Sequence, residues 1–486
     1  MAVATQITLK PSGRNSGDVL RIESGKLRET GFDLRVAGEP WEARRARGKA
    51  LRRETTRESQ ANWSSPRKRP DPLHLIAASN VGRQKEFIPL RMGRMAASPF
   101  TFLRGAAVVM ACDLSHTPSS GIQVVMDGDA HVNNFGLFGT PQRDVIFDLN
   151  DFDEVVVGPW EWDLKRLVAS INVSGRENGL NRKERRAAVM RCVAGYRWNV
   201  NRLQSVGVLE TWYLHAYPGR QNPLVEIDPK SAAVFKKAVA KAMHQTNSTL
   251  LTKTAGRNVD GAWRLKEDPP VLTHVDSATR EKVIDALNQY ADTLTRERRY
   301  MLGRYHVVDV GHRVVGVGSV GTRAYLALLF GNGDTDPLFL QVKEAIVPAH
   351  APYLPRMPEE FTHQGKRVIA GQRALQASSD ILLGWTSIDG RPFYVRQMKN
   401  LKASVPTEWL TGESFNFYVW ICGAILARAH SRTGDAASIA GYCGNSEVLD
   451  EALATWAEAY GDQTEADHAL LVKAIKNSRV KAITGV

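Results

Sequence analysis

Residues 126–136, MDGDAHVNNFG, constrain this chain more than any other stretch. The stretch lies between the apolar runs IQVV and FGLF, and it carries five acceptor or ligand side chains: Asp127, Asp129, His131, Asn133 and Asn134. A second apolar run follows in VIFDLNDFDE, which adds Asp148, Asp151 and Asp153. Short apolar runs separated by polar turns predict strands, and Asx-rich turns also form for backbone reasons alone.

The spacing of two residues in this turn suits phosphoryl transfer. Asp129 is followed by Asn134 five positions later. In such a loop the aspartate orients or deprotonates an attacking hydroxyl, and the asparagine oxygen binds magnesium. Magnesium needs a further carboxylate, because one or two protein carboxylates usually hold it together with nucleotide phosphates. VIFDLNDFDE can supply that carboxylate.

GDAHVNN followed by NDFDEVVVGPWEWDLKRL resembles the catalytic and metal-binding segments of the aminoglycoside and choline phosphotransferase branch of the protein-kinase-like fold. The resemblance implies that Asp129 is the catalytic base and that Asn134 and Asp151 hold the metal. It implies that Asp163 braces the catalytic loop. Asp148 lies nearer the usual distance from Asn134, so both aspartates stand as candidate metal ligands.

A second motif, GVGSVG, lies downstream of the catalytic loop and resembles the kinase Gly-rich loop. It contributes Gly316, Gly318, Ser319 and Gly321, and Lys343 follows in the strand LFLQVKEA as the counterpart of the kinase lysine. The same string marks dinucleotide folds, but there the glycines open a helix, whereas TRAYLALLF continues as a strand. A lysine in an apolar strand favours an anionic partner such as a nucleotide phosphate. We therefore expect ATP and magnesium as cofactors.

The motifs occur in the reverse of the usual kinase order. The catalytic loop comes first, FYVRQMKN is expected to be the hinge, and FYVWICGAILARAH is expected to be the helix that ordinarily precedes the catalytic loop. Over residues 45–475 the chain resembles the bacterial family called domain of unknown function 2252, with landmarks GDAHVNNFG, FDLNDFDE, GPWEWDLKRL and ARAHSRTGD. The resemblance implies an α+β, two-lobe, protein-kinase-like fold that is circularly permuted.

Some positions depart from the kinase pattern. The lysine of a kinase pairs with a glutamate on the next helix, and the candidates here are Glu359 and Glu360, although the distance to the next strand favours Gln372. His131 is expected to lock the turn by hydrogen bonding. Arg104 and Arg373 are candidate phosphate contacts, although surface ion pairing is the commoner use of arginine.

Periodicity divides the chain into five expected parts: a flexible tail at 1–40, a basic arm at 41–98, the catalytic loop with helices at 99–302, a β-rich nucleotide-binding lobe at 303–400, and C-terminal helices at 401–486. Strands and turns are expected to dominate residues 84–160, and residues 247–276 are expected to be mostly loop. The segment from 159 to 173 predicts a helix that buries Trp160, Leu164, Leu167, Val168 and Ile171. Asp389-Gly390 predicts a hairpin turn.

Charge and cysteine content narrow the partners. The formal charge is +13, and the segment from Glu42 to Arg69 holds ten Lys and Arg against three Glu. We expect a solvated face there, which disfavours nucleic-acid binding. Four scattered cysteines without a CxxC pair predict neither a zinc site nor a disulfide framework, and a cytoplasmic location fits them. No apolar run reaches the roughly 18–20 residues that span a bilayer.

The sequence therefore predicts an ATP- and magnesium-dependent phosphotransferase that acts on a hydroxyl or amine of an unidentified small molecule. Two alternatives use the same nucleotide site. One is AMP transfer to a protein, and the other is a nucleotide-binding pseudokinase that serves as a regulatory module. The oligomeric state is not predicted.

Overall fold

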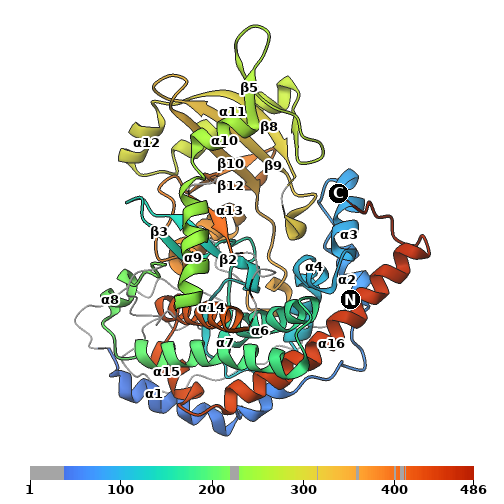
Figure 1. The fold of residues 1–486 in the computed structure, drawn as a ribbon, viewed down its shortest axis with the longest axis vertical. Helices are drawn as coiled ribbons and strands as arrows, with labels where there is room; N and C mark the ends of the chain where they lie inside the picture. Colours follow the sequence, from blue (N-terminus) through green and yellow to red (C-terminus); the bar gives the residue numbers. More distant parts are fainter. Residues whose placement is uncertain are drawn as a thin grey trace.

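The computed structural model describes residues 38–218, 229–314, 316–356, 361–398, 401–405, 410 and 412–485. The fold is of the α+β type, with a helical part below and a β-rich part above (Figure 1). The helical part is built on four long helices: α6 (Trp160–Glu177), α7 (Arg182–Leu203), α14 (Gly412–Thr433) and α16 (Val448–Lys476). The largest hydrophobic core lies among these helices.

The β-rich part is one six-stranded antiparallel sheet in the order β11-β12-β10-β9-β8-β7. Its strands are β7 (Leu272–His274), β8 (His306–Arg313), β9 (Ala324–Phe330), β10 (Pro337–Glu344), β11 (Gly384–Ile388) and β12 (Arg391–Gln397). Three helices pack against it: α10 (Asn247–Thr254), α11 (Ser277–Ala291) and α13 (Gln364–Leu375). The expected Asp389-Gly390 hairpin joins β11 to β12, with both residues at positive φ.

Side chains alternate across this sheet because successive residues of a strand point to opposite faces. Leu340 and Val342 of β10 belong to the core formed with α11, whereas Phe339 belongs to the core beside α10. Lys343 follows the alternation of Phe339 and so points away from the α11 side. Its partner across the strands is Tyr394 of β12.

Two small sheets flank the Asp- and Asn-rich turn. β1 (Gln123–Met126) pairs with β4 (Val156–Pro159), and β2 (Phe135–Gly139) pairs with β3 (Val145–Leu149). The segment that follows β12 adds β13 (Ala403–Ser404) to the free edge of β2. The predicted strands on both sides of the turn are therefore confirmed.

The expectation of strands and turns between residues 84 and 122 is wrong. This segment forms three helices: α3 (Ile88–Ala96), α4 (Pro99–Gly105) and α5 (Ala107–Leu114). Ser98 and Thr101 make a reciprocal capping box at the start of α4, and Pro99 occupies its first turn. Short apolar runs such as AAVVMACDL fit a buried helix as well as a strand, so periodicity alone did not separate them.

The loop expected at 247–276 is also wrong in part, because it contains α10, β7 and a small hairpin of β5 (Ala255–Arg257) and β6 (Trp263–Leu265). The helix predicted from residue 159 is confirmed, and all five of its predicted core residues are fully buried. The remaining helices are α8 (Val208–Tyr213), α9 (Pro229–Met243), α12 (Arg296–Leu302) and α15 (Ala436–Cys443). The four cysteines are buried and free, as expected without a disulfide framework.

The end of α14 meets the strand that leads into the Asp- and Asn-rich turn. Thr433 Oγ1 accepts a hydrogen bond from the Val125 backbone N–H at 3.3 Å. Gly434 approaches so closely that a Cβ atom there would lie 2.6 Å from Val124 Cγ1. Residues about 300 positions apart in sequence are therefore neighbours at this point.

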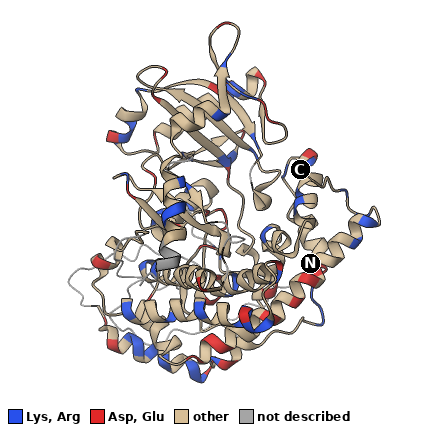
Figure 2. Cartoon of the chain, in the orientation of Figure 1, with Lys and Arg blue, Asp and Glu red and all other residues tan. Residues whose placement is uncertain are grey.

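The basic segment between residues 41 and 98 packs along the C-terminal helices (Figure 1). Its helix α1 (Trp41–Ala50) lies against α15, and α2 (Pro72–Ala78) begins after an Asp71 cap. Arg44 and Arg47 pair with Asp435, and Arg69 bonds both Asp113 and Asp467. Acidic and basic residues are interspersed along these lower helices (Figure 2). No helix among the described residues is long and apolar enough to cross a membrane.

We predict that Arg69 fixes this segment to the rest of the molecule. Asp113 and Asp467 are only 2% and 3% exposed, so Arg69→Ala leaves two buried carboxylates without their cation. The free energy of unfolding should fall by about 3 kcal/mol, and trypsin should cleave within residues 41–71 much faster. Urea unfolding and timed proteolysis of the full chain measure both effects. Arg53→Ala, at an exposed position of the same segment, is the matched control and should change neither. Cleavage of the wild-type segment at the rate of an unstructured tail would contradict this anchoring.

Candidate functional site

A cavity of about 600 Å³ lies where the sheet, the Asp- and Asn-rich turn and the helices α2–α5 meet. Several segments of the chain contribute to its lining, which includes Arg83, Arg91, Arg104, Asp129, His131, Asp151, Asp153, Glu154, Gly316, Gly318, Ser319 and Glu344. Three of the predicted motifs therefore line one space: the turn at 127–134, the acidic segment at 148–154 and the Gly-rich loop.

The turn is held at its start by the carboxylate of Asp163. Asp163 accepts the backbone N–H groups of Asp127 at 2.7 Å and Gly128 at 2.9 Å. Gly128 has a φ of 76°, and a Cβ atom there would lie 2.2 Å from the Glu154 carbonyl oxygen, so only glycine fits. His430 at the end of α14 lies 3.2 Å from Asp163, through Nε2. A residue from the C-terminal part of the chain thus supports the turn.

Asp129 presents one carboxylate oxygen to the protein and the other to the cavity. Its Oδ1 accepts hydrogen bonds from Nε and Nη2 of the buried Arg166 on α6, at 2.9 and 2.7 Å. Its Oδ2 accepts no hydrogen bond from the residues that the structure describes, and lies 3.8 Å from His131 Nε2. Burial raises the pKa of Asp129 to about 6, although Arg166 acts to lower it. A carboxylate of this kind can take a proton near neutral pH.

His131 contributes to the turn mainly through its backbone. Its N–H donates to the Asp129 carbonyl and its carbonyl accepts from the Asn134 N–H, both at 2.7 Å. The imidazole lines the cavity, and its buried Nδ1 has no hydrogen-bond partner in the described part of the chain. Burial, with the charges of Arg104 and Arg166, holds the pKa of His131 well below its usual value. The ring is therefore neutral.

Asn134 and Asp151 are residues whose oxygen atoms could hold a metal ion. The Asn134 amide nitrogen donates to Asp127 Oδ1 and to the backbone carbonyls of Asp129 and Asp151, at 3.0–3.2 Å. Asp151 Oδ1 and Asp127 Oδ2 are buried, and within the described ranges no group donates a hydrogen bond to them. No preformed cluster of three His, Cys, Asp or Glu occurs among the described residues. A small number of ligand oxygens without hydrogen-bond partners suits a magnesium ion that nucleotide phosphates also bind.

Asp148 does not line this cavity. Its Oδ1 accepts a hydrogen bond from Arg428 Nη2 at 2.6 Å, and its Oδ2 accepts one from the Ala377 N–H at 2.8 Å. Asp148 and Arg428 are 1% and 0% exposed. The register of β3 explains this position, because Asp148 lies opposite Gly136 within the sheet, whereas Asp151 follows the end of the strand. Of the two candidate ligands, only Asp151 reaches the cavity.

Lys343 forms an ion pair with Asp153, a carboxylate of the acidic segment that was not among the predicted site residues. The Lys343 ammonium donates to Asp153 Oδ2, which also accepts from Ser319 Oγ at 3.0 Å. The Tyr394 hydroxyl donates to Asp153 Oδ1 at 2.8 Å. Although burial acts to lower it, the pKa of Lys343 is raised by the nearby carboxylates of Asp151 and Asp153. One carboxylate therefore joins the acidic segment, the Gly-rich loop and two strands of the sheet.

The Gly-rich loop connects two neighbouring antiparallel strands, β8 and β9. Residues Val317–Ser319 form a single 3-10 turn, and Gly321 has a φ of 86°. Gly316 and Gly318 line the cavity. No helix follows the loop, which rules out the dinucleotide-binding arrangement for this motif.

The described helix after Lys343, α13, contains no glutamate. Glu359 and Glu360 lie outside the described residues, and α13 begins later, at Gln364. Gln372 donates a hydrogen bond to Gln376 Oε1 at 2.9 Å. Arg373 donates to the Leu383 carbonyl and is not among the residues that line the cavity.

Sequence reasoning missed three groups of this site: Asp153, Glu154 and Arg166. Asp153 and Glu154 belong to the DFDE string, in which spacing alone does not tell one carboxylate from another. Arg166 lies three positions after Asp163 on α6, so the two share a helix face, and this spacing is a signal that could have found it. Burial raises the pKa of Glu154 to about 7, and its Oε2 accepts the Ala349 N–H at 2.6 Å.

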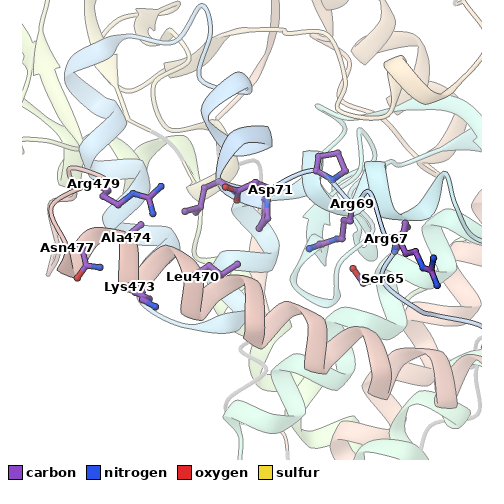
Figure 3. Close-up of a pocket in the computed structure, with 13 residues that line it drawn as sticks. Ser65, Arg67, Arg69, Asp71, Leu470, Lys473, Ala474, Asn477 and Arg479 are labelled. Carbon is purple, nitrogen blue, oxygen red and sulfur yellow. The ribbon is translucent and has the colours of Figure 1, made fainter.

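A second hollow of about 480 Å³ lies between α16 and the segment 65–73 (Figure 3). Basic side chains are prominent in its lining, with Arg67, Lys473 and Arg479 around the opening. Arg69 lies there too, but Asp113 and Asp467 already neutralise it. The hollow shares no lining residue with the first cavity, so it is separate from the candidate site.

Comparison with protein families matches residues 83–474 to the family described as an uncharacterized protein conserved in bacteria (DUF2252). This match covers well over half of the 486 residues. It includes the turn, the acidic segment, the Gly-rich loop and Lys343. No curated protein and no solved structure matches the chain.

The position of Asp148 leads to a stability prediction. Asp148→Asn leaves the fully buried Arg428 guanidinium without a counter-charge, so the free energy of unfolding should fall by about 3 kcal/mol. Asp292→Asn, which alters an exposed pair with Arg299, should change it by less than about 0.5 kcal/mol. Urea unfolding curves of both variants and the wild type measure the difference. Equal stability of the two variants would show that the buried Asp148–Arg428 pair stabilises the fold no more than the exposed Asp292–Arg299 pair does.

Proposed function

The chain belongs to the bacterial DUF2252 family, and we propose that it is an ATP- and magnesium-dependent phosphotransferase whose acceptor is a small molecule with a hydroxyl or amine group. We further propose that its fold is a circularly permuted version of the protein-kinase-like fold. The single observation that carries the proposal is the convergence of Lys343, the Gly-rich loop and the acidic segment on Asp153, in the cavity that Asp129 lines.

The arrangement of the sheet supports the kinase-like fold. In protein kinases a Gly-rich loop covers the nucleotide phosphates, and the essential lysine lies on the third strand of that lobe. Here the loop joins β8 to β9, and Lys343 lies on β10 beside β9. A helix, α13, and two further strands, β11 and β12, follow. The contact of α14 with β1 supports the permutation, because it joins the chain's late helix to the strand before the catalytic loop.

The proposed chemistry assigns a task to each side chain. Asp129 Oδ2 accepts the proton of the acceptor hydroxyl while the acceptor oxygen forms a bond to the γ-phosphorus of ATP. The bond from that phosphorus to the bridging oxygen breaks, and ADP leaves with the electron pair. Arg166 holds Asp129 in position through Oδ1. Lys343 and the backbone N–H groups of the Gly-rich loop bind the phosphates.

Asn134 and Asp151 are the residues that would hold magnesium. The buried, unpartnered Asp151 Oδ1 supports this role, since a cation would compensate its lost hydration. When bound, the metal would neutralise charge on the phosphates. Asp153 bonds Lys343 in this structure and is the neighbouring carboxylate of the same segment.

One observation favours a second candidate, a protein that binds nucleotide without transferring phosphate. Active protein kinases pair the lysine with a glutamate on the next helix. Lys343 pairs with Asp153 instead, and Gln372 stands near the expected position on α13. The set of Asp129, Asn134 and Asp151 favours the transferase, because a pure binding module has no need of a proton acceptor.

The transferase assignment predicts the behaviour of Asp129→Asn. The full chain is incubated with magnesium, γ-labelled ATP and a pool of small hydroxyl- and amine-bearing metabolites, and label on low-mass products is counted. Transfer should fall about 10²-fold or more, because the acceptor loses its proton acceptor. ATP affinity should stay within a few-fold, because Asp129 is not proposed to hold the phosphates. A parallel reaction with α-labelled ATP, in which label on protein is counted, tests AMP transfer to a protein.

Asp292→Asn serves as the matched control, because this aspartate is largely exposed and lies on the far side of the sheet. It should transfer label at the wild-type rate. Undiminished transfer by Asp129→Asn would remove Asp129 from the chemistry. Magnesium-dependent ATP binding by a wild type that labels no product would favour the binding module.

A further inference from the structure

Three arginines, Arg83, Arg91 and Arg104, line the cavity. None of them forms an ion pair with a carboxylate among the described residues. They come from the chain that precedes the catalytic turn: Arg83 follows α2, Arg91 lies on α3, and Arg104 lies on α4. Arg91 is only 2% exposed. Buried guanidinium groups without a counter-charge are costly unless a ligand compensates them.

The hydrogen bonds of two of these arginines go only to neutral oxygens. Arg83 donates to the carbonyls of Ser79 at 3.1 Å and Val320 at 2.7 Å. Arg91 donates to the side chains of Ser79 and Asn80 and to the Gly105 carbonyl. These contacts orient the guanidinium groups, and neither group forms an ion pair with a carboxylate among the described residues.

Arg104 has still fewer contacts. No described residue accepts a hydrogen bond from its guanidinium, and its Nε is buried without a partner. The guanidinium lies 6.0 Å from the centre of the Phe100 ring. Arg104, Asp129 and Asp151 line the same cavity. Burial lowers the pKa of Arg104, although the charges of these two carboxylates act to raise it.

Three other arginines of the interior face carboxylates. Arg69 bonds Asp113 and Asp467, Arg166 bonds Asp129, and Arg428 bonds Asp148. Arg367 binds only neutral oxygens, but it is not a lining residue of the cavity. Arg83, Arg91 and Arg104 therefore combine two features, the lack of an ion-pair partner within the described part of the chain and a position in the lining of a cavity.

The three arginines belong to other elements than the groups proposed to hold the nucleotide. Lys343 lies on the sheet and bonds Asp153, which also accepts a hydrogen bond from Ser319 of the Gly-rich loop. Arg83 and Arg104 border that loop from the helical side, because the Arg104 carbonyl would be 3.5 Å from a Cβ atom at Gly318 and the Arg83 Cβ would be 3.2 Å from one at Gly321. Arg104 and His131 are close enough for the arginine to affect the imidazole pKa. The cluster thus borders the place where an acceptor must meet Asp129.

We propose that Arg104, with Arg83 and Arg91 beside it, binds an oxyanion group of the acceptor. The substrate of this site is then a small molecule that carries a phosphate or a similar anionic group in addition to the hydroxyl or amine that is modified. This inference rests on the proposed phosphotransferase function, because only that function makes the bound molecule a phosphoryl acceptor. The anion-binding property itself follows from the arginines alone. Guanidinium groups suit this task because their fork of N–H donors matches phosphate oxygens.

Inorganic phosphate is the probe for this anion site. The full chain is titrated calorimetrically with phosphate, in the presence and absence of saturating magnesium and ADP. We expect saturable binding that persists when ADP is bound, since the acceptor anion and the nucleotide occupy different places. In Arg104→Gln the phosphate affinity should fall at least tenfold, while the affinity for magnesium and ADP should stay within threefold.

Two controls keep the result interpretable. Arg53→Gln removes an exposed arginine away from the cavity and should leave phosphate affinity unchanged. Arg104→Gln should unfold at or above the wild-type urea concentration, because it removes a buried charge that has no carboxylate partner. A loss of phosphate binding in a stable variant then reports the site rather than the fold.

Three outcomes would overturn the assignment. The absence of saturable phosphate binding would remove the anion site. Wild-type phosphate affinity in Arg104→Gln would remove Arg104 from it. Displacement of phosphate by magnesium and ADP would assign the arginines to the nucleotide instead of the acceptor. Phosphate binding that depends on Arg104, in a protein that binds no nucleotide, would retain the anion site and refute the phosphotransferase.

Discussion

The candidate site depends on the hydrogen bonds that the Asp153 carboxylate accepts. It accepts hydrogen bonds from Lys343 on β10, from Tyr394 on β12 and from Ser319 in the Gly-rich loop. Burial acts to raise the pKa of Asp153, but Lys343 and Tyr394 outweigh it and hold the pKa below its usual value. The carboxylate therefore remains ionised and keeps the sheet and the acidic segment together.

A second carboxylate, Asp163, holds the Asp- and Asn-rich turn in place. It fixes the backbone at Asp127 and Gly128, and it receives support from His430 of α14. His430 is in turn 2.8 Å from the Tyr196 hydroxyl, through Nδ1. The helical part thus places the turn through α6, α7 and α14. Asp153 links the acidic segment to the sheet. Asp129 and the Gly-rich loop, which come from distant parts of the chain, therefore line one cavity.

Local patterns predicted much of this arrangement, and long-range contacts account for the rest. The strands beside the turn, the helix from Trp160 and the strand that carries Lys343 followed from periodicity. The choice among Asp148, Asp151 and Asp153 did not, because it depends on where β3 ends and on Arg428, which lies 280 positions away from Asp148. Of the three arginines in the cavity, the sequence singled out only Arg104, as a candidate phosphate contact. Arg83 and Arg91 were not predicted, since they reach the cavity only after α2 and α3 have packed. The helices at 88–114 were misassigned because short apolar runs do not distinguish a buried helix from a strand.

Calorimetric titration of the full chain with ATP, with and without magnesium, tests whether Lys343 and the acidic segment form one nucleotide site. Asp153 of that segment and Lys343 are 190 residues apart in sequence. We expect magnesium-dependent binding that weakens at least tenfold in Lys343→Ala and is unchanged in Lys282→Ala, whose lysine is exposed on α11. No binding by the wild type, or equal binding by Lys343→Ala, would contradict this assignment.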